Sequence, residues 1–464
     1  MMGRPTAPFE QRLSLFVFLG LSAAVGLAFC GLYALLTHPD IHRGLMLALG
    51  GYNYENTAAG YADIRRVMAP YAVPDTVRLL SWDAHTYHRI ATEGYSAEHF
   101  WMTAFFPWFP TLWGTLQLPV TLLPVLHFSI FSLGMAVLFT TFGSRFTPKV
   151  QVLLYLGLMV LPSFTIMYMP YPEAWSFLFL SLALRAIMRG QNYTLFFWML
   201  CYATTRPNVL LLGCALLGWA MHVFWHERRW YLPAFRPMLW SGAGVAVGLL
   251  LVFGWYAYKT GSFFIFFEAQ KVWNTQLQWP EQWSDWSIEM KGLNLSLVML
   301  GGVVAIISLL RALHRGAWRQ DLFASLQVWA WWAWLGIALH VMVFQGGNLH
   351  SAHRYLMAQP LFVLLVLGWV ERVSTWPNWT KWVVWATGLG CTAWLLAGLG
   401  KIKYFQLFES GPYWWMVVGG LWIFFMTGKW RWYKVVGFGV WCLAGLLYQT
   451  FLWNVFLSRG WIWA

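Results

Sequence analysis

The densest group of chemically versatile residues is the run Ser81–Tyr95, which reads SWDAHTYHRIATEGY. If residues 84–92 form an amphipathic helix, Asp83, Tyr87 and Ile90 share one of its faces. A carboxylate held beside an aromatic ring at a membrane surface is suited to take a proton from a hydroxyl group. The alternative is that Asp83 only caps the N-terminus of this helix, a position at which aspartate is favoured.

Two arginines further along the chain could bind a phosphate group. Arg206 and Arg354 each stand where polar sequence meets an apolar run, and a guanidinium group matches phosphate oxygens in a bidentate way. His350 and His353 flank Arg354 and could add hydrogen-bond donors. The alternatives are an ion pair between Arg206 and Glu173 and, for Arg354, a side chain that only extends to the lipid head groups.

The sequence gives weak signals for a metal site. His85 and His88, like His350 and His353, have the spacing i, i+3, but no HExxH motif is present and no DxD motif follows the first apolar run. The five cysteines lie inside apolar runs without a CxxC pair, so they are expected to be packing residues. We therefore predict no cofactor and leave a divalent metal open.

The elements that must position these residues are membrane helices. The chain has 464 residues, of which 59% are apolar and only 10% charged, a composition that excludes an ordinary soluble domain. Apolar stretches of about 20 residues recur along it, which is the length of a membrane-spanning helix. We expect an all-α polytopic membrane protein with a single domain, 1–464, and thirteen spans. The predicted spans are 13–36, 127–146, 150–169, 173–189, 193–207, 208–225, 238–258, 293–310, 322–345, 355–370, 383–400, 413–428 and 435–456.

The charge distribution predicts which ends of these helices face the cytoplasm. With a cytoplasmic N-terminus, the cytoplasmic segments hold seventeen Lys and Arg against four Asp and Glu, and thirteen of each remain on the other side. The whole net charge of +13 then lies on the cytoplasmic face, as the positive-inside rule requires, so no nucleic-acid partner is needed to explain it.

The same topology places two polar segments on the outer face. They are residues 37–126, a long loop that ends in a Pro-broken apolar piece suited to a juxtamembrane or re-entrant element, and residues 259–292. We expect the first to form short helices on the membrane surface. The tryptophans of the second could wall a sugar or lipid acceptor, or form a plain interfacial lid.

Several of these segments resemble one family. The string WDAxxYxxIAxxGY at residues 82–95, followed by AFFPWFP at 104–110, resembles the signature of the PIG-V family. This family comprises the second mannosyltransferase of GPI-anchor assembly and its bacterial relatives, within the GT-C superfamily of polyprenyl-phosphate-sugar-dependent glycosyltransferases. Three shorter segments, in the family's order, resemble its Y-T-E-S, T-R-x-x and R-Y/F…P elements. They are Tyr171-Pro172-Glu173-Ala174, Thr205-Arg206-Pro207-Asn208, and His353-Arg354-Tyr355 with Pro360.

The resemblance covers residues 75–365 and departs at Pro172, where the family more often has threonine. It implies an inverting transfer of a sugar, mannose by family default, from a polyprenyl-phosphate donor to a lipid or glycan acceptor at the outer face of the bilayer. It also implies Asp83 as general base. The donor phosphate would be bound by Arg206, Arg354, His350 and His353, and the substrate by Trp82, His85, Tyr87, Tyr171, Glu173 and Tyr355.

The likeness to bacterial members favours the bacterial inner membrane, with the endoplasmic reticulum membrane as the alternative. Two other classes stay open. One is an O-antigen-ligase-like enzyme, although it would not predict the WDAxxY and AFFPxFP strings. The other is a transporter or flippase of lipid-linked sugars, in which Met169–Pro172 and Arg206–Pro207 would be broken helices lining a midplane site.

Overall fold

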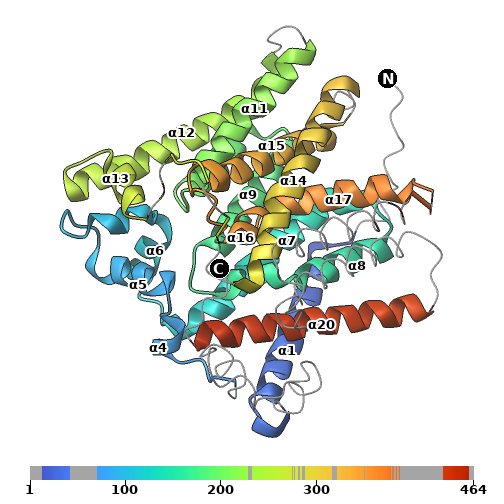
Figure 1. Cartoon of the computed structure of the whole chain (residues 1–464), viewed down its shortest axis with the longest axis horizontal. Coiled ribbons are helices and arrows are strands. Elements are labelled where there is room, and N and C mark those ends of the chain that lie inside the picture. The colour runs from blue at the N-terminus through green and yellow to red at the C-terminus, as the bar shows by residue number, and fades with distance from the viewer. Residues whose placement is uncertain are drawn as a thin grey trace.

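The computed structural model describes residues 13–41, 71–227, 232–273, 277–280, 283–284, 288–315, 321–349, 351–377 and 432–458, with isolated positions at 275, 379, 380, 383 and 386. Throughout these ranges the regular elements are helices, and no strand forms. The prediction of an all-α fold is confirmed (Figure 1).

The helices follow one another along the chain with short connections. They are α1 (Leu15–Leu36), α4 (Thr76–Leu79), α5 (Asp83–Glu93), η3 (Phe100–Ala104), α6 (Trp108–Leu116), η4 (Val120–Leu122), α7 (Leu123–Phe142), η5 (Gly143–Arg145), α8 (Pro148–Met159), η6 (Pro162–Tyr168), α9 (Glu173–Met188), α10 (Asn192–Ala203), α11 (Val209–Glu227), α12 (Leu232–Thr260), α13 (Ile265–Val272), α14 (Ile288–Arg315), α15 (Leu322–Val343), α16 (Ala352–Met357), α17 (Pro360–Ser374) and α20 (Trp432–Leu457).

Six described segments are long and apolar enough to cross a membrane. They are Leu15–Leu36, Val120–Arg145, Phe235–Thr260, Asn294–His314, Leu322–Val343 and Lys434–Leu457, and α8 with η6 makes a seventh if the bent pair is one span. The protein is therefore membrane-embedded, but the described residues do not reach the predicted thirteen spans.

The shortfall in spans has two sources. The predicted spans 173–189, 193–207, 208–225 and 355–370 are helical but shorter than expected, and 383–400 and 413–428 lie almost wholly outside the described residues. The span predicted at 355–370 is divided, because α16 ends at Met357 and a new helix starts at Pro360. Helix α9 is buried along almost its whole length against α7 and α10, so it is enclosed by protein.

The bent pair α8 and η6 is stabilised by one glutamine of α20. The two helices meet at 72°, which leaves backbone carbonyls without partners inside the helix. The buried Gln449 amide donates to the Met159 and Leu161 carbonyl oxygens at 3.0 and 2.9 Å, and its own oxygen accepts from the Tyr168 hydroxyl at 3.3 Å. Satisfying these carbonyls is what allows a helix to break inside an apolar bundle.

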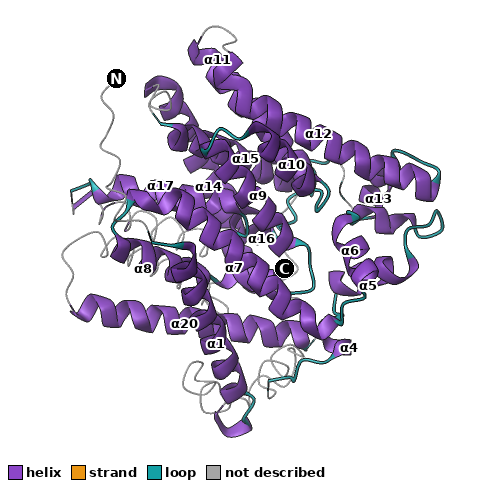
Figure 2. Ribbon diagram, turned by 180° about the vertical axis from the view of Figure 1, so that it is seen from behind, coloured by secondary structure: helices purple, strands orange, loops and turns teal. Residues whose placement is uncertain are grey.

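Helices α4, α5, α6 and α13 lie together at one edge of the bundle (Figures 1 and 2). Part of the first outer loop thus forms short helices, as predicted, and the amphipathic helix expected at 84–92 is α5. The second stretch, 59–68, lies outside the described residues. The Pro-broken piece 104–124 forms the nine-residue α6 and the short η4, so it contains no span of its own.

Two tyrosines fix the AFFPWFP turn against this group of helices. The hydroxyls of Tyr95 and Tyr256 both donate to the Phe105 carbonyl oxygen, at 2.7 and 3.0 Å. Nearby, α5 and α6 approach so closely that a Cβ at Gly114 would collide with the Ala91 carbonyl oxygen. The loop helices are therefore packed onto the bundle as a fixed unit.

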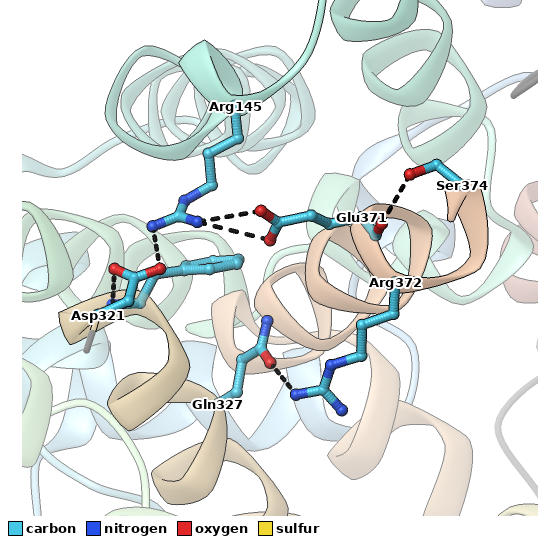
Figure 3. A network of polar contacts seen from close by, with 7 residues as sticks. Arg145, Asp321, Gln327, Glu371, Arg372 and Ser374 are labelled. Atoms are coloured by element: carbon cyan, nitrogen blue, oxygen red, sulfur yellow. Dashed lines mark hydrogen bonds and ion pairs between the residues drawn. The ribbon is translucent and has the colours of Figure 1, made fainter. Parts of the chain in front are cut away.

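A polar network joins three helix ends elsewhere in the bundle (Figure 3). Arg145 pairs with Asp321 and, at 3.2 Å, with Glu371. Arg372 donates to the Gln327 side-chain oxygen at 2.8 Å. We call these five residues the Arg145 network. Its four charged members all belong to the set predicted to be cytoplasmic, and they lie at the end of α17 opposite Pro360.

Candidate active site

Asp83 is the first residue of α5 and does not act as its N-cap. The cap position belongs to Trp82, whose backbone has a φ of +55°, a value that residues other than glycine rarely adopt. The alternative reading of Asp83 as a capping residue is therefore wrong. This turn directs the carboxylate into the molecule, where Oδ2 accepts from the Arg354 NH1 and NH2 groups at 3.4 and 3.5 Å.

Arg354, on α16, also binds the first residue of α9. Its Nε donates to the Glu173 Oε1 atom at 2.6 Å, and its NH2 group contacts the same oxygen. Arg354 thus connects two carboxylates whose segments are far apart in the sequence. Its contacts with Glu173 are shorter than those with Asp83.

Arg206 completes the group from the connection between α10 and α11. Its NH2 group lies 3.2 Å from the Glu173 Oε1 atom, so both arginines share one carboxylate oxygen. The ion pair anticipated between Arg206 and Glu173 is present. We call Asp83, Glu173, Arg206 and Arg354 the Asp83 cluster.

Two tyrosines line the cluster. The Arg354 guanidinium lies 5.3 Å from the ring centre of Tyr171 and 6.0 Å from that of Tyr355, and the Arg206 guanidinium lies 5.9 Å from the Tyr355 ring. Contacts of this kind stabilise a cation by the negative face of the ring. The predicted substrate-binding residues Tyr171, Glu173 and Tyr355 therefore gather around the two arginines.

Burial differs sharply within the Asp83 cluster. The Glu173 side chain is 0% exposed and those of Arg354 and Arg206 are 6% and 10% exposed, whereas that of Asp83 is 22% exposed. The two acids and two arginines carry no formal net charge together. Among the four, Asp83 offers the largest surface to an incoming molecule.

The electrostatics of Asp83 reflect this partial burial. Desolvation raises the pKa of the Asp83 carboxyl above its usual range, the positive charge of Arg354 lowers it in part, and the charge of Glu173 raises it. Burial by itself lowers the pKa of Arg354, but the carboxylates of Glu173 and Asp83 raise it further, so this guanidinium stays charged. An aspartate with a raised pKa is a stronger base than one in water.

Tyr87 lies on the buried face of α5 next to Asp83, as the helical pattern predicts. Its ring contacts those of Phe105, Phe109 and Tyr171, with centroid distances of 5.1, 5.3 and 6.4 Å. Burial, together with the charges of Glu173 and Asp83, raises the pKa of the Tyr87 phenol, which is therefore neutral and available as a hydrogen-bond donor.

Other predicted site residues lie apart from the cluster. Trp82 and His85 are exposed, and His350 lies outside the described residues. His353 is buried, and both its backbone N–H and its Nδ1 donate to the Asn294 Oδ1 atom at 2.9 Å. It therefore orients α16, and its predicted contact with the donor phosphate is not seen.

The alternative of Arg354 as a head-group residue also fails, because its side chain is enclosed in ion pairs. The hairpin expected around it is the short helix α16, which His353 fastens to Asn294 of α14. The sequence had suggested a surface position because Arg354 stands next to an apolar run, whereas the division of that run at Pro360 brings it inside.

Two positioning residues were missed from the sequence. Asn294 holds α16, and His127, buried in α7, donates from Nδ1 to the Met169 carbonyl oxygen at 2.5 Å. The Tyr171 N–H donates to the same oxygen at 2.7 Å, which shapes the turn before Glu173. A lone polar residue within an apolar helix was the available signal for both.

Within the described part of the chain, no group of three or more His, Cys, Asp or Glu side chains lies close enough to hold a metal ion. The His85–His88 pair on α5 has no carboxylate ligand to complete a site there, since the nearby Glu93 pairs with Arg89 at 2.7 Å. What the Asp83 cluster can do chemically is accept a proton at Asp83 and bind an anion at its arginines.

Comparison of the chain with protein-family models, with curated proteins and with solved structures gives no match. The resemblance to the PIG-V family is carried by the motif residues alone, and the membership it implies stays a prediction.

Proposed function

We propose that this protein is an integral membrane glycosyltransferase that moves a sugar from a polyprenyl-phosphate donor to a hydroxyl group of a lipid or glycan acceptor. The observation that carries the proposal is the Asp83 cluster: a partly exposed carboxylate lies 3.4 Å from an arginine that is itself held by a buried glutamate. Four segments, three of them near the resemblance motifs that follow the first, converge to build it.

The reaction needs two groups, and the cluster contains both. A base must take the proton of the acceptor hydroxyl, and cations must stabilise the negative charge on the departing phosphate. In the proposed step the acceptor oxygen bonds to the anomeric carbon as the bond from that carbon to the phosphate oxygen breaks. The hydroxyl proton goes to Asp83, and the electron pair leaves with the polyprenyl phosphate. Attack opposite the leaving group inverts the anomeric configuration.

Asp83 suits the role of base better than Glu173. The Glu173 Oε1 atom is already bonded to two guanidinium groups and its side chain is inaccessible. The Asp83 Oδ1 atom has no hydrogen bond to any described residue, and the side chain is open to one side. An acceptor hydroxyl could therefore approach Asp83 without breaking the pairing of the arginines with Glu173.

Arg206 and Arg354 are assigned to the donor phosphate with different parts. Arg354 directs its donors to Glu173 and Asp83, so it sets the position of the base. Arg206 has one ion-pair contact among the described residues and five N–H donors, which leaves donors for phosphate oxygens. Mannose as the sugar and the bacterial inner membrane as the location follow from the resemblance only.

The experiment is release of polyprenyl phosphate by the purified protein in nanodiscs supplied with a short-chain polyprenyl-phosphate sugar and an acceptor lipid extract. We expect release that requires the acceptor and is abolished by Asp83→Asn. Asp75→Asn is the matched control, because Asp75 is an exposed acid that caps α4 and pairs with Arg78. A donor that stays chemically intact under all conditions contradicts the proposal.

One observation favours the transporter alternative. The 72° break between α8 and η6 and the irregular turn at 169–172 give a discontinuous helix that ends at the cluster, a feature found at transporter binding sites. Reconstituted vesicles distinguish the two functions. A transporter moves the intact lipid-linked sugar between leaflets, whereas a transferase separates the sugar from its phosphate.

A further inference from the structure

Arg354 divides its donors unequally between two carboxylates. Its contacts with Glu173 include a hydrogen bond of 2.6 Å, whereas both contacts with Asp83 are 3.4 Å or longer. Charge-assisted hydrogen bonds are normally 2.7–2.9 Å, so the pair with Asp83 is loose and the pair with Glu173 is tight. Asp83 is therefore the partner that Arg354 can exchange at the lower cost.

The exposed side of the cluster is also the side of Asp83. Glu173 is inaccessible and holds Arg206 and Arg354 through one oxygen, so both cations stay in place when Asp83 moves away. An anion that enters the site meets the loose end of Arg354 first. The site is thus built with one fixed carboxylate and one displaceable carboxylate.

The charges match a phosphodiester. With Asp83 counted, the cluster is neutral, and without it Glu173, Arg206 and Arg354 leave one positive charge. A polyprenyl-phosphate sugar carries one negative charge at its phosphodiester. Exchange of Asp83 for the donor phosphate at Arg354 therefore keeps the buried site neutral, which avoids the large cost of an uncompensated buried charge.

From these three features we infer that the donor phosphate displaces Asp83 from Arg354, so that the base is set free only in a site already loaded with donor. The inference rests on the proposed function and adds its order of events. In the empty site Asp83 is paired and a poor base, and once displaced it loses the cation that holds its proton affinity down. The other charged or titratable groups that act on it are Glu173, Arg206, Tyr87 and Tyr171.

A competition of this kind has a consequence that a simple base would not have. If Asp83 and phosphate compete for Arg354, removing the charge of Asp83 must tighten phosphate binding while it abolishes turnover. The probe is farnesyl phosphate, with its Kd measured by calorimetry on the full chain in nanodiscs. We expect Asp83→Asn to bind it about 5- to 30-fold more tightly, a range typical of the coupling between neighbouring charges.

Two comparisons make the result specific. Asp75→Asn removes the same charge from an exposed site 8 positions away in sequence and should leave the Kd unchanged. In an Arg354→Gln background, binding should be weaker, and the further change Asp83→Asn should no longer tighten it. The wild-type affinity should also rise as the pH falls through the pKa of Asp83, relative to the Asn variant, in which only the phosphate itself titrates.

Unchanged or weaker binding by a folded Asp83→Asn variant overturns the inference, as does equal tightening by Asp75→Asn, which would indicate a general charge effect. These outcomes concern binding alone. The proposed function fails on a different measurement, the retention of turnover by Asp83→Asn, so the two failures are distinguishable.

Discussion

The Asp83 cluster and the Arg145 network contain the same charged groups, two carboxylates and two arginines each, in very different surroundings. Side chains of the Arg145 network are exposed by 24% at Arg145, 35% at Asp321 and 31% at Glu371, whereas Glu173 in the Asp83 cluster is fully enclosed. Water therefore screens the first group and not the second. Equal charges do different things when their solvent differs.

The contacts differ in what they join. The Arg145 network ties the ends of three regular helices, and Asp321 also caps α15 by accepting from the Phe323 N–H at 3.0 Å. The Asp83 cluster joins irregular connections and short helices, where shielded charges cost stability unless all are paired. The first arrangement is what a bundle needs to hold its helix ends. The second is costly for folding alone, and this is the physical reason to assign it to function.

The comparison assumes that the two groups face opposite sides of the membrane, which all-or-none labelling tests. In a cysteine-free background, we expect an impermeant thiol reagent on intact cells to label Glu98→Cys and to leave Gln191→Cys unlabelled until the membrane is opened. Both positions are exposed, and the charge asymmetry places them on the outer and cytoplasmic sides. Labelling of position 191 but not 98 would reverse the orientation and place the Asp83 cluster inside.

The largest graded effect should come from exchanging the two aspartates. Asp83→Asn keeps the size of the side chain and removes the basic oxygen, so we expect turnover to fall by at least about 100-fold at normal abundance. Asp321→Asn loses an ion pair but keeps capping ability, and its turnover should stay close to wild type. Because burial raises the pKa of Asp83, wild-type kcat/KM should decline as the pH falls through a midpoint above the usual aspartate range.

Retention of most activity by a folded Asp83→Asn variant would move the role of base to another acid. A loss of activity in Asp321→Asn equal to that in Asp83→Asn would remove the functional distinction between the two groups.

The residues of the Asp83 cluster could be chosen from the sequence, because the first motif is dense and the charge asymmetry collects outer helix ends on one side. The buried face of α5 followed from its helical period. The pairing of Arg354 with Asp83 did not, since it joins residues 271 positions apart through the fold. The role of His353 was also hidden, because its partner Asn294 lies on another helix.

The number of spans was the weakest prediction of the fold. Composition marks an apolar run, but it does not say whether lipid or protein surrounds the helix. Helix α9 is as apolar as a span and is enclosed by neighbouring helices, and the run around 355–370 is divided at Pro360. Enclosure and division both depend on tertiary packing, which single-sequence periodicity does not contain.

A stability difference should separate the two glutamates. Glu173→Gln leaves two buried arginines without their shared carboxylate, so we expect a loss of about 3–5 kcal/mol of unfolding free energy, the range for breaking a buried ion pair. Chemical denaturation in mixed micelles measures it. The double variant Glu173→Gln, Arg206→Gln restores neutrality and should recover part of the loss. A Glu173→Gln variant as stable as wild type would mean that the cluster is not the desolvated site described above.

The arginines should differ in their tolerance of lysine. Arg354→Lys keeps the charge but cannot hold Glu173 and Asp83 at once, so we expect a partial defect of about tenfold in kcat/KM with Arg354→Gln worse. Arg145→Lys, at the more exposed network, should be close to wild type. Steady-state kinetics with a short-chain donor decides this. Near-normal rates for both Arg354 variants would leave Arg206 as the remaining phosphate residue.

The smallest expected effect concerns Glu371. Its pair with Arg145 is partly exposed and shares that arginine with Asp321, so Glu371→Gln should cost about 1 kcal/mol or less of unfolding free energy. Because solvent ions screen exposed charges, the cost should shrink further between low and high salt, whereas the cost of Glu173→Gln should hardly change. Denaturation of both variants at two ionic strengths measures this difference. A salt-independent loss of several kcal/mol in Glu371→Gln would show that the Arg145 network is as desolvated as the Asp83 cluster, and burial would then no longer mark out one of the two as the active site.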